Sequence, residues 1–197
     1  KERIEIIKSS SASLLSLISD LLDAQKLDLG QLRIKTKQEN LKSTAGKTIA
    51  VMSPQAQADQ VEIINGIKND LYATYDDDRI RQVMTNLMKN SLRAVSPKTG
   101  KIEILAEDTP SEVRVSVKDN GKGIPKDKQK DLFKKFYQVD TSLTREKGGS
   151  GLGLSICKGI VRTHGGKIWL ESEPGKGTIV TFTIPKDNPS PITKTAI

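Results

Sequence analysis

Apolar side chains near the start of the chain recur at steps that alternate between three and four residues, which is the heptad spacing of a helix that packs on other helices. This seam consists of Ile4, Ile7, Ser11, Leu14, Ile18, Leu21 and Gln25, and it is widened by Leu15, Leu17 and Leu22. Charged residues fall elsewhere, so an isolated helix would leave an apolar stripe in water. The helix is expected to end at Gly30. It either packs on the following domain or belongs to an antiparallel helix pair that dimerises into a bundle, and the heptad spacing favours the bundle.

Beyond Gly30 the pattern alternates between the period of strands and the period of helices. Strands are predicted at residues 32–35, 63–67, 71–74, 102–106, 113–117, 167–171 and 179–184. After the first strand, three pairs of neighbouring strands are expected to be antiparallel: 63–67 with 71–74, 102–106 with 113–117, and 167–171 with 179–184. The first of these pairs is expected to turn at Asn69 and Asp70. Helices are predicted from residue 41 to the fifties, where Pro54 limits or bends the helix, and at 76–95, 128–136 and 152–163.

These elements predict an α+β fold: a two-layer α/β sandwich with helices on one face of a mixed, mostly antiparallel sheet. We expect residues 1–30 to form the long helix, residues 31–187 the sandwich, and residues 188–197 a mobile tail. The chain begins with Lys1 and Glu2, directly before the helical pattern and without a signal peptide, which suggests a piece of a longer protein.

Composition and charge narrow the classes of protein. The 197 residues include 32 Lys and Arg and 24 Asp and Glu, for a net charge of +8, but basic and acidic residues are interspersed and only 4% are aromatic. Single-strand nucleic-acid binders need aromatic stacking as well as basic charge, so no direct nucleic-acid binding is expected. No apolar run approaches the roughly 20 residues of a membrane span. A single cysteine, Cys157, excludes an internal disulfide framework and favours a reducing compartment such as the cytoplasm.

Two segments could bind the metal and base of a nucleotide. On the helix at 76–95, Gln82, Asn86 and Asn90 recur every four residues and share one face. An amide oxygen is a suitable ligand for Mg²⁺, although an exposed polar face would have the same pattern. After the strand at 113–117, the Asp119 carboxylate can accept a hydrogen bond from an amine such as that of adenine. The glycines that follow it let the backbone bend close to a flat ligand, unless the segment is an ordinary surface turn.

The third segment, residues 148–154, has glycines that open a helix, and free N–H groups at a helix N-terminus favour phosphate. A Rossmann loop would follow a strand immediately, whereas this segment follows a polar stretch. A Walker A loop would end in Gly-Lys-Ser/Thr, and the nearest match, residues 175–178, is interrupted and lies in a hairpin turn.

In their order along the chain, these segments resemble the ATP-binding catalytic domain of sensor histidine kinases, which share a Bergerat-type fold with type II topoisomerases, mismatch-repair ATPases and heat-shock chaperones. Residues 78–91 resemble the asparagine box, 119–123 the first glycine box, 132–137 the phenylalanine box and 149–153 the second glycine box. The similarity spans about 32–185. Residues 9–29 resemble the second helix of the family's dimerisation and phosphotransfer hairpin.

The resemblance implies ATP and Mg²⁺ as ligands. Asn90 is implied as the metal ligand, Asn86 as a polar neighbour of the phosphates with a catalytic role, Asp119 as the adenine-reading carboxylate, and Arg93 as a catalytic phosphate contact. The remaining implied nucleotide contacts are Gly121, Gly123, Tyr137, Gly149, Ser150, Gly151, Leu152, Gly153 and Thr178.

The chain departs from related ATPases at two places. Gln82 stands where some of them have a glutamate general base, and an amide cannot act as a base, which disfavours rapid hydrolysis and fits transfer to another nucleophile. Gln138 stands where some members have a phosphate-clamping arginine, so this charge could come from Arg93, Arg145 or Lys147.

The single histidine, His164, is predicted to be structural because it ends a helix before Gly165 and Gly166, where histidine interacts with the carbonyl end of the helix dipole. The resemblance places the phosphoacceptor on a helix that would precede Lys1. Cys157 is expected in the core.

The sequence therefore predicts the catalytic part of a two-component sensor histidine kinase, a homodimer through its hairpin helices with a response-regulator receiver domain as partner. Any membrane contact would come from upstream segments. The alternatives are a nucleotide-binding pseudokinase scaffold and a serine kinase of the anti-sigma type, and the heptad helix disfavours the latter.

Overall fold

The computed structural model describes residues 2–138 and 150–186 and has the expected α+β class. Its helices are α1 (Glu2–Asp28), α2 (Leu41–Ala58), α3 (Asp77–Ala94), α4 (Lys126–Gln129) and α5 (Gly153–Thr163). Its strands are β1 (Lys37–Asn40), β2 (Glu62–Asn65), β3 (Tyr72–Tyr75), β4 (Lys101–Asp108), β5 (Glu112–Asp119), β6 (Ile168–Glu173) and β7 (Gly177–Pro185). No helix of the described ranges is long and apolar enough to cross a membrane.

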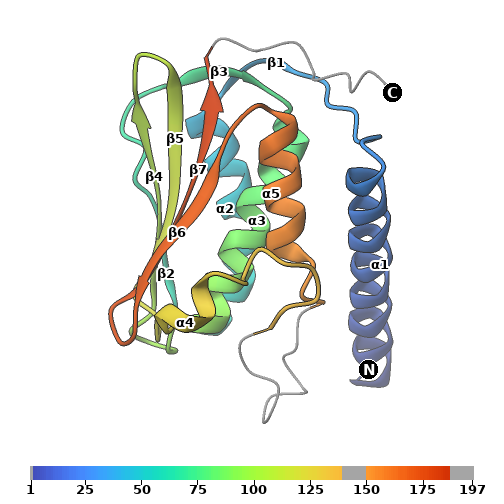
Figure 1. Cartoon of the computed structure of the whole chain (residues 1–197). Coiled ribbons are helices and arrows are strands. Elements are labelled where there is room, and N and C mark those ends of the chain that lie inside the picture. Colours follow the sequence, from blue (N-terminus) through green and yellow to red (C-terminus); the bar gives the residue numbers. More distant parts are fainter. Residues whose placement is uncertain (1, 139–149, 187–197) are drawn as a thin grey trace.

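The main sheet has five strands in the order β2-β4-β5-β7-β6, and α2, α3 and α5 cover one of its faces (Figure 1). All neighbours are antiparallel except β2 and β4. Alternate residues of the central strands, such as Ile104, Val115 and Phe182, are fully buried beneath the helices. Leu87 of α3 and Ile160 of α5 complete this core, so the period-two pattern of the strands and the 3.6-residue period of the helices meet in one apolar layer.

Three sequence-based predictions about elements are wrong in detail. Residues 32–35 form no strand; the strand begins at Lys37 and pairs with β3 in a separate two-stranded sheet. The expected pair about Asn69 does not form, because β2 pairs in parallel with β4 instead. The short helix expected at 128–136 is confined to Lys126–Gln129. The helix expected from residue 41 into the fifties does form, and it continues through Pro54 to Ala58.

Helix α1 stands beyond α3 and α5, on the side of the helices away from the sheet (Figure 1). Its contact side includes Asp23 and Ala24, which are buried, and Leu27, which packs on Gly159 of α5. A Cβ at Gly159 would lie only 2.5 Å from the Leu27 side chain, so a larger residue there would force that side chain to shift. The apolar seam faces away: Leu14, Ile18 and Leu21 are 46–59% exposed. The seam therefore does not pack on the following domain.

The expected domain division at residues 30 and 187 stays a prediction. The expected tail, residues 188–197, and the polar segment that contains Arg145, Lys147 and Gly149 lie outside the described residues.

Candidate nucleotide-binding site

Helix α3 supplies the polar face that was predicted for the asparagine box. The Asp76 carboxylate caps the helix by accepting a hydrogen bond from the N–H of Arg79 at 3.1 Å. Apolar residues such as Met84 and Met88 anchor one side in the core, and the other side presents Asn86, Asn90 and Arg93. Asn86 is half-buried, whereas Asn90 and Arg93 are exposed and accessible to a ligand.

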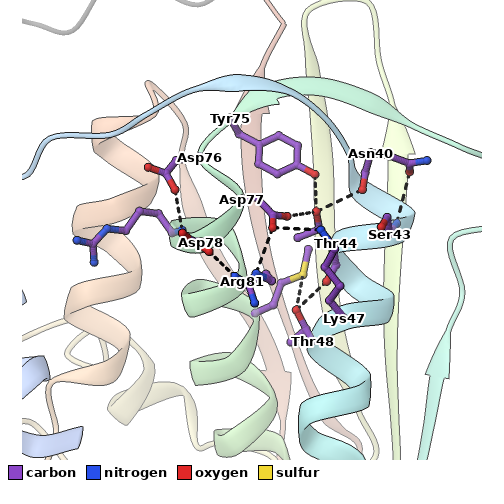
Figure 2. A network of polar contacts seen from close by, with 12 residues as sticks. Asn40, Ser43, Thr44, Lys47, Thr48, Tyr75, Asp76, Asp77, Asp78 and Arg81 are labelled. Atoms are coloured by element: carbon purple, nitrogen blue, oxygen red, sulfur yellow. Dashed lines mark hydrogen bonds and ion pairs between the residues drawn. The ribbon is translucent and has the colours of Figure 1, made fainter. Parts of the chain in front are cut away.

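A network of polar contacts fixes the first turn of α3 to α2 (Figure 2). The Thr44 hydroxyl lies 2.8 Å from the Tyr75 hydroxyl and donates to the Asp77 carboxylate at 2.5 Å. The Asp77 carboxylate also pairs with Lys47 and Arg81. Burial raises the pKa of Tyr75 to about 12, so its hydroxyl stays protonated and can donate to Thr44. The network holds α3, and with it the asparagine box, in a fixed place on the sheet.

The Asp119 carboxylate lies buried at the end of β5, between α3 and β7. It accepts three hydrogen bonds: from the Ser91 hydroxyl at 2.9 Å, from the Gly121 N–H at 2.9 Å and from the Thr178 N–H at 3.2 Å. Burial raises the pKa of the Asp119 carboxyl above its ordinary value, and the three donors oppose that rise. The structure thus brings Asp119, Gly121 and Thr178 together as predicted. Ser91 was not singled out, although it directly follows Asn90 in the sequence.

The glycines near Asp119 serve close packing of the backbone on itself. A Cβ at Gly121 would lie 2.7 Å from the backbone of Ala94, at the end of α3. Gly123 has a φ of +68°, and a Cβ there would lie 2.0 Å from the Glu173 carbonyl oxygen. A Cβ at Gly177 would likewise lie 2.0 Å from the Asp119 carbonyl oxygen. The space that the sequence suggested for a flat ligand is therefore filled at these positions by the protein's own backbone.

The phenylalanine box and the second glycine box meet at the start of α5. The N–H of Phe136 donates to the Gly151 carbonyl at 2.9 Å, and Gly151 has a φ of +69°. The Ser150 hydroxyl accepts a hydrogen bond from the Leu152 N–H at 3.2 Å. Leu152 is buried, which anchors the first turn of α5, and Tyr137 is half-buried beside Phe136.

The asparagine box lies against this turn. A Cβ at Gly153 would make ordinary contact, 3.7 Å, with the side chain of Asn86. The Asn86 Nδ2 atom is buried and approaches the Cys157 thiol, but it has no acceptor oxygen or nitrogen within hydrogen-bond distance among the described residues. A buried amide N–H without an acceptor, next to the N-terminus of a helix, is suited to donating a hydrogen bond to a phosphate oxygen.

Comparison with known proteins agrees with this geometry. Residues 75–188, more than half of the chain, match the family described as histidine kinase-, DNA gyrase B-, and HSP90-like ATPase. The chain belongs to this ATPase family. Sensor histidine kinase WalK of Bacillus subtilis is 35% identical over 184 residues, which are 91% of this chain and 30% of WalK. Signal transduction histidine-protein kinase BarA of Escherichia coli is 33% identical over 198 residues, with 96% and 21% covered.

Solved structures of histidine kinases also resemble the chain. The catalytic domain of histidine kinase ThkA superposes with a TM-score of 0.68 at 33% identity, over 77% of this chain and 98% of that domain. Full-length ShkA in complex with AMPPNP gives a TM-score of 0.81 at 26% identity, over 93% of this chain and 38% of ShkA. The chain thus contains a histidine kinase catalytic domain, and it spans only about a fifth to a third of the length of the curated relatives named above.

Gln82, which stands where some ATPases of the family have a general base, contacts α1. Its Nε2 donates to the Asp23 carboxylate at 2.8 Å and its Oε1 accepts from Arg79 at 2.8 Å. The same Arg79 nitrogen donates to both Asp23 oxygens, at 3.0 and 3.2 Å. This group of three side chains, which we call the Asp23 cluster, joins α1 to α3. The sequence did not indicate this cluster because Asp23 is 56 residues from Arg79 and 59 from Gln82, so no local pattern joins it to them.

The sole histidine has no free ring nitrogen. His164 is 3% exposed; its Nδ1 lies 2.9 Å from the Ile160 carbonyl, and its Nε2 accepts from the Asp76 N–H at 3.2 Å. Burial lowers the pKa of His164, so the ring is neutral. The predicted structural role is confirmed, but through these two hydrogen bonds and not through a charge on the helix dipole. Cys157 lies in the core as expected, although it is fully and not partly buried, and burial raises the pKa of its thiol to about 12.

Proposed function

We propose that this chain is the ATP-binding catalytic part of a sensor histidine kinase. It would transfer the γ-phosphoryl group of ATP to a histidine outside these 197 residues, for relay to an aspartate of a response regulator. The observation that carries the proposal is the unfilled amide donor of Asn86 beside Gly153, at the N-terminus of α5. Three other residues, Asp119, Ser150 and Asn90, have the polar groups that the rest of an ATP molecule needs.

In this proposal the adenine amine donates to the Asp119 carboxylate. Three of about four acceptor positions on a carboxylate are already used here, so one remains for the base. The phosphates bind the N–H groups at the start of α5 and the amide of Asn86. The exposed amide oxygen of Asn90 fits Mg²⁺, which takes few protein ligands and keeps its waters and phosphate oxygens. When bound, the metal would neutralise phosphate charge during transfer.

The acceptor histidine is proposed to lie elsewhere because both ring nitrogens of His164 are engaged and the ring is buried. The exposed seam of α1 supports a homodimer of helical hairpins, in which the second helix of each hairpin is α1. A response-regulator partner is supported by the relative ThkA, whose structure in complex with response regulator protein TrrA has a TM-score of 0.73 to this chain. ATP as substrate would place this segment in the cytoplasm.

Calorimetric titration of the chain with Mg²⁺ and ATP tests the proposal. Asn90→Ala and Asp119→Ala should each weaken binding about tenfold or more, because each removes a ligand group from its partner. Asn69→Ala, in an exposed loop, is the matched control and should bind like the unchanged chain. Equal affinity in Asp119→Ala would exclude the adenine assignment, and equal affinity in Asn90→Ala would exclude the metal assignment.

A further inference from the structure

A polar cavity of about 340 Å³ lies between α1 and α3 at the level of Asn86. Asn86 and Lys89 of α3 line one wall, and Ser19 and Asp20 of α1 line the other. Burial raises the pKa of the Asp20 carboxyl, and the nearby charge of Lys89 and the hydroxyl of Ser150, from the second glycine box, oppose that rise. The cavity therefore brings Asn86 and Lys89, which are suited to binding phosphate, close to the Asp20 carboxylate of α1.

The two cations of this cavity differ in what they are bound to. Arg79 is held by the Asp23 cluster, through hydrogen bonds to both oxygens of Asp23 and to Gln82. Lys89 is exposed, and its positive charge acts on the carboxylate of Asp20. A lysine ammonium on a flexible side chain can change partners at little cost, whereas an arginine held by two partner side chains cannot. Lys89 is therefore the cation that is available to a ligand entering the cavity.

The position of Lys89 on α3 also fits a phosphate contact. It lies three residues after Asn86, on the same side of the helix, and directly precedes Asn90. Arg93, which the resemblance implied as a phosphate contact, does not line this cavity. Nothing in the family resemblance pointed to Lys89.

We propose that Lys89 is a further catalytic residue, whose ammonium group binds the γ-phosphate of ATP, and that the Asp20 carboxylate across the cavity is the counter-charge of this ammonium group while ATP is absent. The inference rests on the proposed function. A γ-phosphate carries more negative charge than the single carboxylate of Asp20, so it replaces Asp20 as the counter-charge of Lys89. ADP has no γ-phosphate and leaves Asp20 as that counter-charge.

In the transfer step a nitrogen of the acceptor imidazole attacks the γ-phosphorus and forms an N–P bond. The bond from phosphorus to the bridging oxygen breaks, and that oxygen leaves with the electron pair as part of ADP. The imidazole N–H proton passes to water. Lys89 keeps its proton throughout and stabilises the charge on the equatorial oxygens of the transferring group.

Paired titrations with MgADP and with Mg-AMPPNP, a non-hydrolysable ATP analogue, test the role of Lys89 without an acceptor. Lys89→Met should weaken AMPPNP binding about tenfold and change ADP binding less than about twofold, because only the γ-phosphate contact is lost. Asp20→Asn should act in the opposite direction and strengthen AMPPNP binding several-fold, because it removes the competing carboxylate. Lys68→Met, an exposed lysine in the loop after β2, is the control and should change neither affinity.

The outcomes separate this inference from the proposed function. An unchanged AMPPNP to ADP affinity ratio in Lys89→Met overturns the role of Lys89, and so does an equal loss for both nucleotides. If Arg93→Met alone changes the ratio, the γ-phosphate contact belongs to Arg93. If the unchanged chain binds neither nucleotide, the proposed function itself fails.

Discussion

Three polar side chains inside the molecule differ in how much hydrogen-bonding capacity their neighbours leave unused. His164 has none left, because a backbone carbonyl and a backbone N–H take its two nitrogens. Asp119 retains an acceptor position after three donors. Asn86 retains a whole donor group. A buried group with unused capacity costs stability, so it persists where a ligand completes it, and this separates the structural histidine from the residues of the site.

We predict that His164 contributes to the stability of the fold and is not phosphorylated. The chain incubated with labelled ATP should take up no acid-labile phosphate, and His164→Gln should lower the free energy of unfolding by about 1–3 kcal/mol through two lost or strained hydrogen bonds. Because the folded-state pKa of His164 is lowered, protonation favours the unfolded state. The stability of the unchanged chain should therefore fall, relative to His164→Gln, as the pH drops below about 6.5. Label that disappears in His164→Gln would contradict the structural role.

At the scale of elements, polar networks hold α3 from two sides. The Thr44 network fixes it to α2 near the sheet (Figure 2), and the Asp23 cluster fixes it to α1. The α1 contact is largely polar, and its charged groups would regain water if the helices parted, which lowers the cost of separation compared with an apolar contact. The Thr44 network, with the buried Tyr75, is part of the domain's permanent structure.

The Asp77 carboxyl gives this network a testable pH dependence. Burial alone would raise its pKa, but the Thr44 hydrogen bond and the charges of Lys47 and Arg81 lower it below its ordinary value. A lowered folded-state pKa stabilises the fold above the unfolded pKa, and this stability is lost as the pH falls through the folded pKa. Asp77→Asn should therefore cost about 1–2 kcal/mol at pH 7, and the difference from the unchanged chain should shrink below about pH 4.

Urea unfolding at a series of pH values measures this difference. Asp78→Asn is the matched control, because the neighbouring carboxylate also pairs with Arg81 but its side chain is 82% exposed. Its effect should stay within about 0.5 kcal/mol at every pH. A pH-independent loss in Asp77→Asn would mean that the carboxylate acts only through its shape.

At the scale of the whole molecule, the sequence predicted what depends on local periodicity and missed what depends on distant pairing. The heptad seam, the capped α3 and the two antiparallel hairpins were all predictable, because each follows from neighbouring residues. The pairing of β1 with β3, the parallel pairing of β2 with β4 and the Asp23 cluster join residues with no shared pattern. Within the candidate site, residue order pointed to Asn86 and Asp119, whose roles stay predictions, whereas the place of Lys89 beside α1 required the three-dimensional structure.

The exposed seam of α1 predicts that copies of this chain associate with one another. Leu14, Ile18 and Leu21 are about half exposed in the single chain, and burying the exposed half of each in a helical bundle would contribute about 1 kcal/mol. The chain should therefore self-associate with increasing concentration in sedimentation equilibrium, and Leu14→Glu combined with Leu21→Glu should keep it monomeric. Leu29→Glu, at a position 69% exposed just beyond the end of α1, is the control and should leave association unchanged. Both variants should still bind nucleotide, because the seam faces away from α3 and α5; a chain that stays monomeric at every concentration would show that the seam needs a helix from outside these residues.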